Sequence, residues 1–327
     1  TKEGAGTWTL SGASTYTGAT TINAGTLSVS SLANGGSNSN LGAATADASN
    51  LIINGGTLKY TGTDVTIDRL FTIGANGATV DASGASGTLA FGNTSTLATQ
   101  SSGTTRTLTL TGSGMASLAS IVPNYLTNAT AITKTGAGTW ILSGTNTYTG
   151  ATTINAGTLS VSSLANGGSA SNIGQSVNTA GYLVLGGGTL KYTGTDTTID
   201  RAFTITNSTT GTFEVATAGV SLTISGSAAS STGALTKTGV GTLVLSGSNA
   251  YSGLTTISDG TLKLGAAGGA TNTPLGTVGS GTTVASGATL DLNGYTLGTA
   301  EALTLSGTGY SSAGALTNSS ATTATYS

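Results

Sequence analysis

The sequence predicts an all-β solenoid, in which short strands wind into coils and each coil stacks on the one before it. Three observations support this prediction: a long internal repeat, short segments with alternating side-chain character, and Gly-rich turns between those segments. The 327 residues include 53 glycines, two prolines and 6% charged residues. Such a Gly- and Ser-rich composition is also typical of disordered chains. The recurring alternation and the net charge of only −2 favour an ordered chain.

The first two copies of the internal repeat are nearly identical. Residues 4–37 and 136–169 lie 132 positions apart and differ at three places, which are Thr9/Ile141, Ala13/Thr145 and Ser14/Asn146. A weaker third copy begins 103 residues later and covers 239–264. We therefore expect one continuous solenoid over 1–327, with modules at about 1–132, 133–235 and 236–327, the last one shortened or truncated.

The local signal inside each module has a period of two residues. Large apolar residues alternate with Thr or Ser in 7–10, 26–29, 107–110, 243–245 and 290–292. Alternation over four or five residues, bounded by Gly or Asn, indicates short half-buried strands. Turns with Gly or Asn at 11–12, 54–56 and 293–294 supply the positive φ angles that these residues tolerate. Only two short segments, 31–33 and 115–120, resemble helix starts.

Uneven repeat spacing favours a solenoid over a sandwich, a barrel or a propeller. In a solenoid each coil needs only its neighbours, so coils can be inserted or lost without preventing closure. At about 20–25 residues per coil the chain would form about 13–16 coils. With a spacing of about 4.8 Å between coils, the expected rod is on the order of 60–75 Å long.

Several absences narrow the function. The chain has no Cys and no His, so it lacks a thiolate nucleophile, a Cys-based metal site and the commonest general base. A pI near 4.8 with so few charges indicates no basic surface for nucleic acid. The sequence contains no apolar stretch of about 18 residues, so it predicts no transmembrane helix. We expect no cofactor. The start at Thr1 and the single Met115 suggest a processed product or an excerpt.

One charged constellation occurs twice, and we weighed it as a candidate site. Its members are Lys59, Asp64, Asp68 and Arg69, repeated as Lys191, Asp196, Asp200 and Arg201. Paired carboxylates can bind calcium or act as acid and base on a glycoside. Four residues of extended chain, however, separate Asp64 from Asp68 by about 13 Å, more than the about 6.5–9.5 Å of an inverting glycosidase. Salt bridges or a solvated turn are the favoured interpretation, and we predict no catalytic, cofactor-binding or metal residue.

Aromatic residues recur at fixed positions of the repeat. Tyr16, Tyr148 and Tyr251 could stack on sugars, but their place in a repeat consensus favours packing. Trp8 and Trp140 stand where the third copy has Leu243, which predicts core positions for both. The Gly-rich turn at 34–36 lacks the Lys and the helix start of a phosphate loop.

The segment GTWTLSGASTYTGATTINAGTLSV resembles the passenger-associated repeat of bacterial autotransporters. The first copy matches the pattern of that family at Gly4, Gly6, Thr7, Leu10, Tyr16, Gly18, Thr20, Ile22, Gly25, Thr26 and Leu27, with Trp8 in place of the first Leu. The third copy matches at Leu243, Leu245, Asn249, Tyr251, Gly253 and Ile257. The resemblance implies a right-handed parallel β-helix that crosses the outer membrane of a Gram-negative-type bacterium and is displayed outside. The translocator barrel of the family is not present in these residues.

Together these observations predict a non-catalytic extracellular protein that forms a stiff rod or fibre at the bacterial surface, such as a stalk, an adhesin shaft or a matrix filament. An adhesin whose β-helix face binds glycans or a host or abiotic surface is the alternative. Threonine runs such as 105–111 raise a third option, binding to ice or another crystal surface, which the uneven repeat lengths disfavour. We also expect homotypic association, end to end or lateral, because low charge and open strand edges do little to prevent it.

Overall fold

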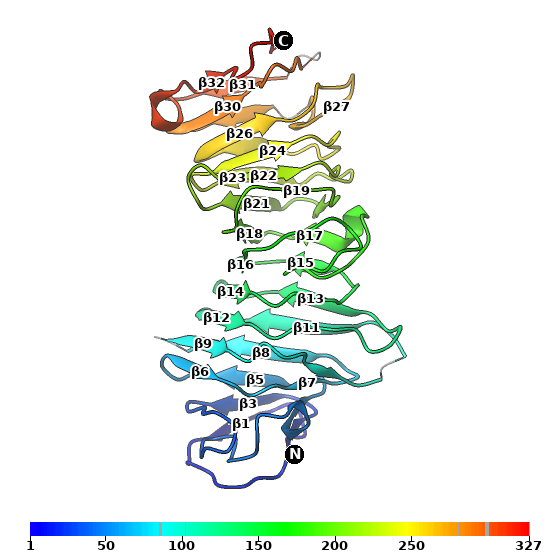
Figure 1. Cartoon of the computed structure of the whole chain (residues 1–327), viewed down its shortest axis with the longest axis vertical. Coiled ribbons are helices and arrows are strands. Elements are labelled where there is room, and N and C mark those ends of the chain that lie inside the picture. The colour runs from blue at the N-terminus through cyan, green and yellow to red at the C-terminus, as the bar shows by residue number, and fades with distance from the viewer. Residues whose placement is uncertain (85–86, 102, 280, 298–300, 327) are drawn as a thin grey trace. The chain divides into compact units, whose positions relative to one another are not determined.

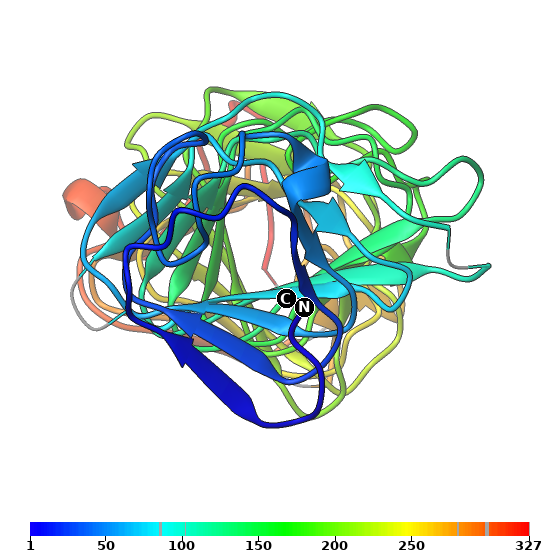
Figure 2. The ribbon, with the colours of Figure 1, turned by 90° about the horizontal axis from the view of Figure 1, so that it is seen from below.

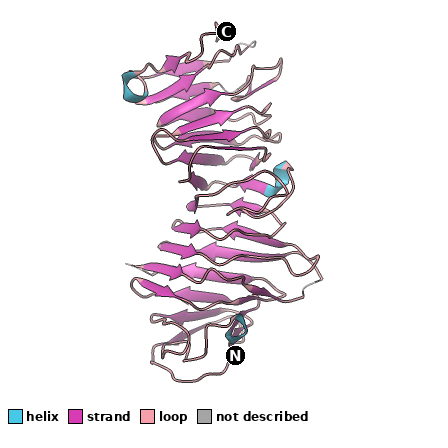
Figure 3. Cartoon of the chain, in the orientation of Figure 1, coloured by secondary structure: helices cyan, strands magenta, loops and turns pink. Residues whose placement is uncertain are grey.

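The computed structural model describes residues 1–84, 87–101, 103–279, 281–297 and 301–326. The chain divides into two compact units. The first unit comprises Thr1–Ser160 with Ser169–Ser176, and the second comprises Val161–Gly168 with Val177–Ser327. Strands separated by loops dominate both units, and the helices in the described part are three short 3-10 turns at Ala48–Asn50, Ala180–Tyr182 and Tyr310–Ser312 (Figure 3).

Three parallel sheets build the first unit (Figure 1). The first sheet contains, in order, β1 (Thr7–Leu10), β3 (Thr26–Val29), β5 (Thr57–Tyr60), β8 (Ala78–Ala82), β11 (Arg106–Thr111), β13 (Thr130–Lys134) and β15 (Thr152–Ile154). The second contains β2 (Thr20–Ile22), β4 (Leu51–Ile53), β7 (Thr72–Ile73) and β10 (Ala98–Thr99). The third contains β6 (Val65–Ile67), β9 (Thr88–Phe91), β12 (Met115–Leu118) and β14 (Thr139–Leu142). Viewed at 90° to Figure 1, the first coils trace a turn around an interior (Figure 2).

The second unit repeats this construction. One sheet contains β18 (Thr189–Tyr192), β21 (Thr210–Val215), β23 (Ala234–Thr238), β25 (Thr255–Ile257), β29 (Thr282–Val284) and β31 (Leu303–Leu305). Another contains β19 (Thr197–Ile199), β22 (Ser221–Ile224), β24 (Thr242–Leu245), β26 (Gly260–Leu264), β30 (Ala288–Asp291) and β32 (Leu316–Thr317). β17 (Leu183–Leu185) pairs with β20 (Thr204–Ile205), and an antiparallel hairpin joins β27 (Asn272–Thr273) to β28 (Gly276–Thr277). β16 (Thr158–Val161) lies at the boundary between the two units.

Sequential strands pair in parallel with strands one coil away, which is the arrangement of a parallel β-helix. The predicted all-β solenoid is therefore confirmed. Like residues stack in register, as in the run from Thr7 to Thr26 and Thr57. The segment 115–120, weighed above as a helix start, contains strand β12 instead. The division into modules at about 1–132, 133–235 and 236–327 stays a prediction.

The core follows the period-two pattern of the sequence. Burial alternates along the strands, as in β11, where Leu108 and Leu110 are buried between half-buried threonines. Leu, Ile and Val fill most interior positions, joined by Phe71 against Phe91 and Phe203 against Phe213 in edge-to-face pairs. Each coil therefore buries a modest apolar stripe, and stacking turns these stripes into a continuous core within each unit.

Coil lengths cover a wider range than the expected 20–25 residues. The register advances by 19 residues from Thr7 to Thr26 and by 31 from Thr26 to Thr57. The longer coil contains the extended loop at 30–50, which leaves the strand register intact. The repeat is therefore set by its strands, and the loops between them can lengthen.

Equivalent strands of the repeat do not lie in the same sheet. In the first unit β1 belongs to the first sheet, whereas its counterpart β14 belongs to the third. The offset between these two copies is thus not a whole number of turns, and they present their outer residues in different directions.

Candidate functional site

The most regular polar feature of the chain is a buried lysine at the start of each repeat. Lys134 and Lys237 are fully buried and Lys2 is 2% exposed. The Lys134 ammonium donates to the carbonyl oxygens of Thr135, Gly136 and Ala156 at 2.7, 2.8 and 3.0 Å. Lys237 and Lys2 bind the three equivalent carbonyls in the same way. We call this arrangement the lysine cage.

The lysine cage joins consecutive coils. Two of its carbonyls belong to the turn that follows the lysine, and the third belongs to the turn 22 residues further on. The second turn comes so close that a Cβ on Gly157 would lie 2.5 Å from the Gly136 oxygen. An ammonium has three donors, and in Lys134 all three are used. The group therefore has no proton left to offer a substrate, and its role is structural.

Burial lowers the pKa of Lys134 and Lys237 to about 8. Between pH 8 and 10.5 the unfolded chain therefore binds more protons than the folded chain, so the free energy of unfolding rises with pH. We expect the urea midpoint to increase from pH 8 to 9.5, by about 1–2 kcal/mol in free energy for each lysine.

The control for this pH dependence is Lys134→Met, which removes the proton equilibrium of one of the two cages with a lowered pKa and should reduce the rise by about half. Burial raises the pKa of Tyr60 and Tyr192 above the usual 10, so these two side chains stay protonated in the folded chain across this window. A midpoint that falls from pH 8 to 9.5 would show that the carbonyls favour the ammonium more than burial disfavours it.

A buried tyrosine and its closing loop form the second repeated feature. Tyr148 and Tyr251 are fully buried, and each hydroxyl hydrogen-bonds to the threonine four residues later, Thr152 and Thr255, at 2.6 and 2.8 Å. The loop after the repeat returns to cover the ring. Gly174 in this loop has a φ of +80°, and a Cβ there would lie 2.6 Å from the backbone carbonyl oxygen of Tyr148. The packing interpretation of these two tyrosines therefore holds, while Tyr16 is 39% exposed.

Buried asparagines fasten the same loop to the coil below. The amide of Asn146 accepts the N–H of Val122 at 2.8 Å and donates to the carbonyl of Asn172 at 2.7 Å. Asn249 does the same with Ala228 and Pro274 in the third copy. Ser14 replaces this asparagine in the first copy.

In the structure, the four aspartates of the candidate charged constellation bind backbone amides. Each aspartate accepts backbone N–H groups of another coil or loop: Asp64 from Thr88, Asp68 from Gly35, Asp196 from Ser221 and Asp200 from Gly167. These hydrogen bonds cap turns, because Gly-rich turns expose amides that need an acceptor. Lys59 and Lys191 form ion pairs with acids outside the constellation, Asp81 and Glu214.

Arg69 and Arg201 are buried and hold the closing loop. The Arg69 guanidinium donates to the carbonyls of Ala33 and Gly42 at 2.8 and 2.9 Å, and Arg201 donates to Ala165 at 2.9 Å. Burial lowers the pKa of Arg69, although the nearby Asp68 raises it. The Ile-Asp-Arg sequence is therefore a clamp on the loop of the preceding coil.

Three partly exposed lysines on the strands pair with acids at the matching position of the next coil. Lys59 faces Asp81, Lys191 faces Glu214, and Lys263 faces Asp291, each as register partners on adjacent strands. The N–O distances are 3.9, 2.7 and 3.5 Å. The sequence did not predict these ion pairs, because each acid lies more than 20 residues from its lysine. These pairs favour one strand register over its one-residue slips.

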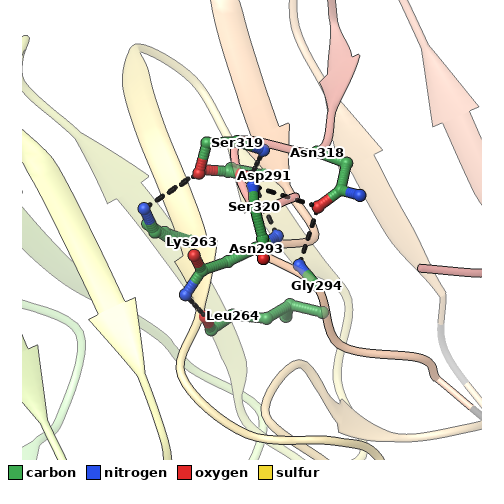
Figure 4. Close-up of polar contacts among 8 residues, drawn as sticks. All are labelled: Lys263, Leu264, Asp291, Asn293, Gly294, Asn318, Ser319 and Ser320. Atoms are coloured by element: carbon green, nitrogen blue, oxygen red, sulfur yellow. Dashed lines mark hydrogen bonds and ion pairs between the residues drawn. The ribbon is translucent and has the colours of Figure 1, made fainter. Parts of the chain in front are cut away.

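The Asp291 pair is the centre of a larger polar network (Figure 4). The carboxylate accepts the N–H groups of Asn293 and Ser319 at 2.9 Å each and the Ser319 hydroxyl at 2.6 Å. Burial alone would raise the pKa of Asp291, but these hydrogen bonds and the Lys263 charge lower it below its ordinary value. Asn318 continues the network by accepting the N–H of Gly294 at 2.7 Å.

We expect Asp291→Ala to lower the free energy of unfolding by about 2–3 kcal/mol, because it removes a charged acceptor from the part-buried amides of Asn293 and Ser319. Asp81→Ala is the matched control: its lysine pair is longer and more exposed, so a loss below about 1 kcal/mol is expected. Urea denaturation of both variants checks the difference. Equal losses would mean that the Asp291 network adds nothing to a surface ion pair.

Trp8 corrects one prediction from the sequence. Trp140 is 1% exposed, as expected of a core residue, but Trp8 is 52% exposed. The two residues occupy the same repeat position. Strand β12 lies against β14 and covers Trp140, whereas β1 is the terminal strand of its sheet. Exposure therefore depends on the neighbouring coil and not on the repeat itself.

Shallow polar hollows lie along β6, β9 and β12. One of about 320 Å³ is lined by Asp64, Gly84, Gly87, Thr88, Ser113, Gly114 and Met115. Neighbouring hollows add Thr66, Asp68 and Asn93. Within the described residues, no three His, Cys, Asp or Glu side chains gather as metal ligands. No helix in that part of the chain is long and apolar enough to cross a membrane.

Comparison with known proteins accounts for the repeated features. Residues 1–29, 132–161 and 235–264 match the passenger-associated-transport-repeat family. Each match contains one lysine cage and one of the three repeat tyrosines. Over 258 residues, 79% of this chain, the sequence is 43% identical to the adhesin autotransporter BmaC of Brucella suis biovar 1. This chain is an autotransporter passenger with repeats.

The passenger is extracellular and surface-exposed, in agreement with the localisation expected from the sequence. Its repeats belong to a transport-repeat family and not to an enzyme family. The chain spans only about 7% of the length of the Brucella relative. No solved structure matches the chain.

Proposed function

We propose that this passenger segment is the structural shaft of a surface adhesin, and that its repeats serve stiffness and display rather than ligand binding. The relative named above is an adhesin. The observation that supports the shaft role most directly is the use of the repeated polar residues. The lysines, asparagines and tyrosines that recur in the copies point inward and bind carbonyls or hydroxyls of their own chain.

The directions of the copies add support. A ligand that bound the same outer residues on successive copies would need those residues along one face. Equivalent strands lie in different sheets, as β1 and β14 do. The repeat therefore preserves the interior of the coil and does not present one repeated outer stripe.

A binding assay tests the shaft proposal. The purified chain is immobilised and screened against bacterial and host glycans and matrix proteins. A shaft is expected to give no saturable binding, while negative-stain electron microscopy shows separate elongated particles. Saturable binding to one glycan class would contradict the proposal.

Glycan binding is the second candidate, because the hollows along β6, β9 and β12 are contiguous and their lining includes the polar side chains Asp64, Thr66 and Asp68. Thr66 is exposed on this face, and its counterpart Thr198 is equally exposed in the second module. If the hollows bind a glycan, Thr66→Lys should abolish binding and Thr198→Lys should leave it unchanged. Loss in neither variant would exclude this face as the binding surface.

A further inference from the structure

An apolar surface is open at one end of the first unit. It is formed by Trp8, Leu10 and Tyr16, which we call the Trp8 surface, and it borders a hollow of about 320 Å³. The exposed fractions are 52% for Trp8 and 39% for Tyr16, against 1% and 0% for Trp140 and Tyr148. The tyrosine hydrogen bond is nevertheless the same, since the Tyr16 hydroxyl lies 2.8 Å from that of Thr20.

The second copy shows what covers this kind of surface. Ala116 lies opposite Trp140, and Leu118 lies opposite Leu142, in the parallel pair of β12 and β14. The indole N–H of Trp140 donates to the carbonyl of Thr111 at 2.9 Å. Four residues after Leu118, the carbonyl of Val122 accepts the N–H of Tyr148 at 3.1 Å.

The third copy is covered by a coil with the same pattern of apolar positions but with side chains of different sizes. Leu222 lies opposite Leu243, and Ile224 lies opposite Leu245. Four residues later comes the buried Ala228, whose carbonyl accepts the N–H of Ala250. Counted from the residue opposite Trp140 or Leu243, both covering coils thus place apolar residues at the first, third and seventh positions. A small residue opposes Trp in one copy, and a Leu opposes Leu in the other.

We infer that the Trp8 surface receives a further β-helix coil, and that this coil carries a small residue such as alanine opposite Trp8. It also carries Leu or Ile two residues later and an apolar residue four beyond that. The small residue is expected because Trp8 already lies opposite Leu27 of β3 on its other side, and a second large neighbour at the same position would overfill a core packed to crystal-like density. The terminal strand β1 offers unpaired backbone groups for the parallel ladder that such a coil needs.

The first test supplies the coil. Residues 1–2 are replaced by a copy of residues 104–134, so that a copied lysine stands in the place of Lys2. Trp140→Phe makes Trp8 the single tryptophan. Covering should shift the Trp8 emission to shorter wavelength and reduce acrylamide quenching severalfold. The same extension with alanine changed to leucine at the copied position 116 should leave Trp8 quenchable.

Two outcomes would overturn the inference. If both extensions protect Trp8 equally, the size rule is wrong. If neither does, and the unextended chain instead protects Trp8 by dimerising at higher concentration, the occupant is a second copy and not a coil of this pattern. Size-exclusion chromatography beside the quenching measurement separates these results.

The second test needs no extension. Ala116→Leu and Trp140→Leu are made singly and together in the otherwise unaltered chain. Each single change should lower the urea midpoint, by overfilling or by leaving a cavity. The double variant reproduces the Leu222–Leu243 pair and should lose much less than the two single losses combined. Additive losses would contradict the size rule.

Discussion

Replacing Lys134 with methionine is expected to lower the free energy of unfolding by about 2–4 kcal/mol. Methionine keeps the length and the apolar stem of the side chain but removes the three donors. The carbonyls of Thr135, Gly136 and Ala156, which lie in two half-buried turns, then lose their partner. Each unsatisfied buried acceptor costs about 1–3 kcal/mol, and the loss is offset in part because no charge has to be buried.

Lys191→Met is the matched control for this variant. Its side chain is 34% exposed and pairs with Glu214 at the surface, so a loss below about 1 kcal/mol is expected. Urea denaturation followed by circular dichroism measures both variants. If Lys134→Met costs no more than Lys191→Met, the lysine cage is not a source of stability.

Trp140→Ala is expected to lower the free energy of unfolding by about 3–5 kcal/mol, whereas Trp8→Ala should cost less than about 1 kcal/mol. The two tryptophans share a repeat position and nearly all of their sequence surroundings. Only Trp140 is covered, and only its indole finds a carbonyl in the coil beneath. The difference therefore measures the contribution of the covering coil alone.

The urea midpoints of the two Trp→Ala variants check this expectation in one experiment. Trp140→Phe serves as a milder third variant, which keeps most of the apolar volume and loses the indole hydrogen bond. Similar losses for Trp140→Ala and Trp8→Ala would contradict the assigned packing, because the two side chains would then be equally covered.

The fold was predictable because its signals are local. Alternation in segments such as 107–110 and 243–245 depends on neighbouring residues, and the structure places both in strands with one buried face. The unequal offsets of 132 and 103 residues favoured stacking, since a solenoid tolerates uneven spacing. The coil lengths were less predictable, because loops such as 30–50 change length without affecting the ladder.

The buried lysines were missed although their signal was present. Lys2, Lys134 and Lys237 each stand two residues before a Gly-x-Gly, so the position recurs in three copies. Lysine is normally exposed, and nothing in the sequence alone showed that carbonyls from a turn 22 residues away would surround it. The acids opposite Lys59, Lys191 and Lys263 were missed for the same reason, since their pairing is set by coil length.

The exposure of Trp8 could not be read from the repeat. Its neighbours in sequence are those of Trp140, and a position buried in one copy is naturally expected to be buried in the other. Burial in a solenoid depends on the next coil, which lies outside the repeat itself. Sequence comparison of copies therefore predicts the inward direction of a side chain but not whether it is covered.

Native-state hydrogen exchange of the unaltered chain tests most directly the claim that the repeated inward residues hold successive coils together. The amides of Asn155 and Ser258 donate to the carbonyls of Lys134 and Lys237, at 2.9 Å each. We predict that both amides are among the slowest to exchange and open only with their whole coil. Exchange as fast as that of exposed turn amides would contradict the account, because the cages would then open without disturbing the stack.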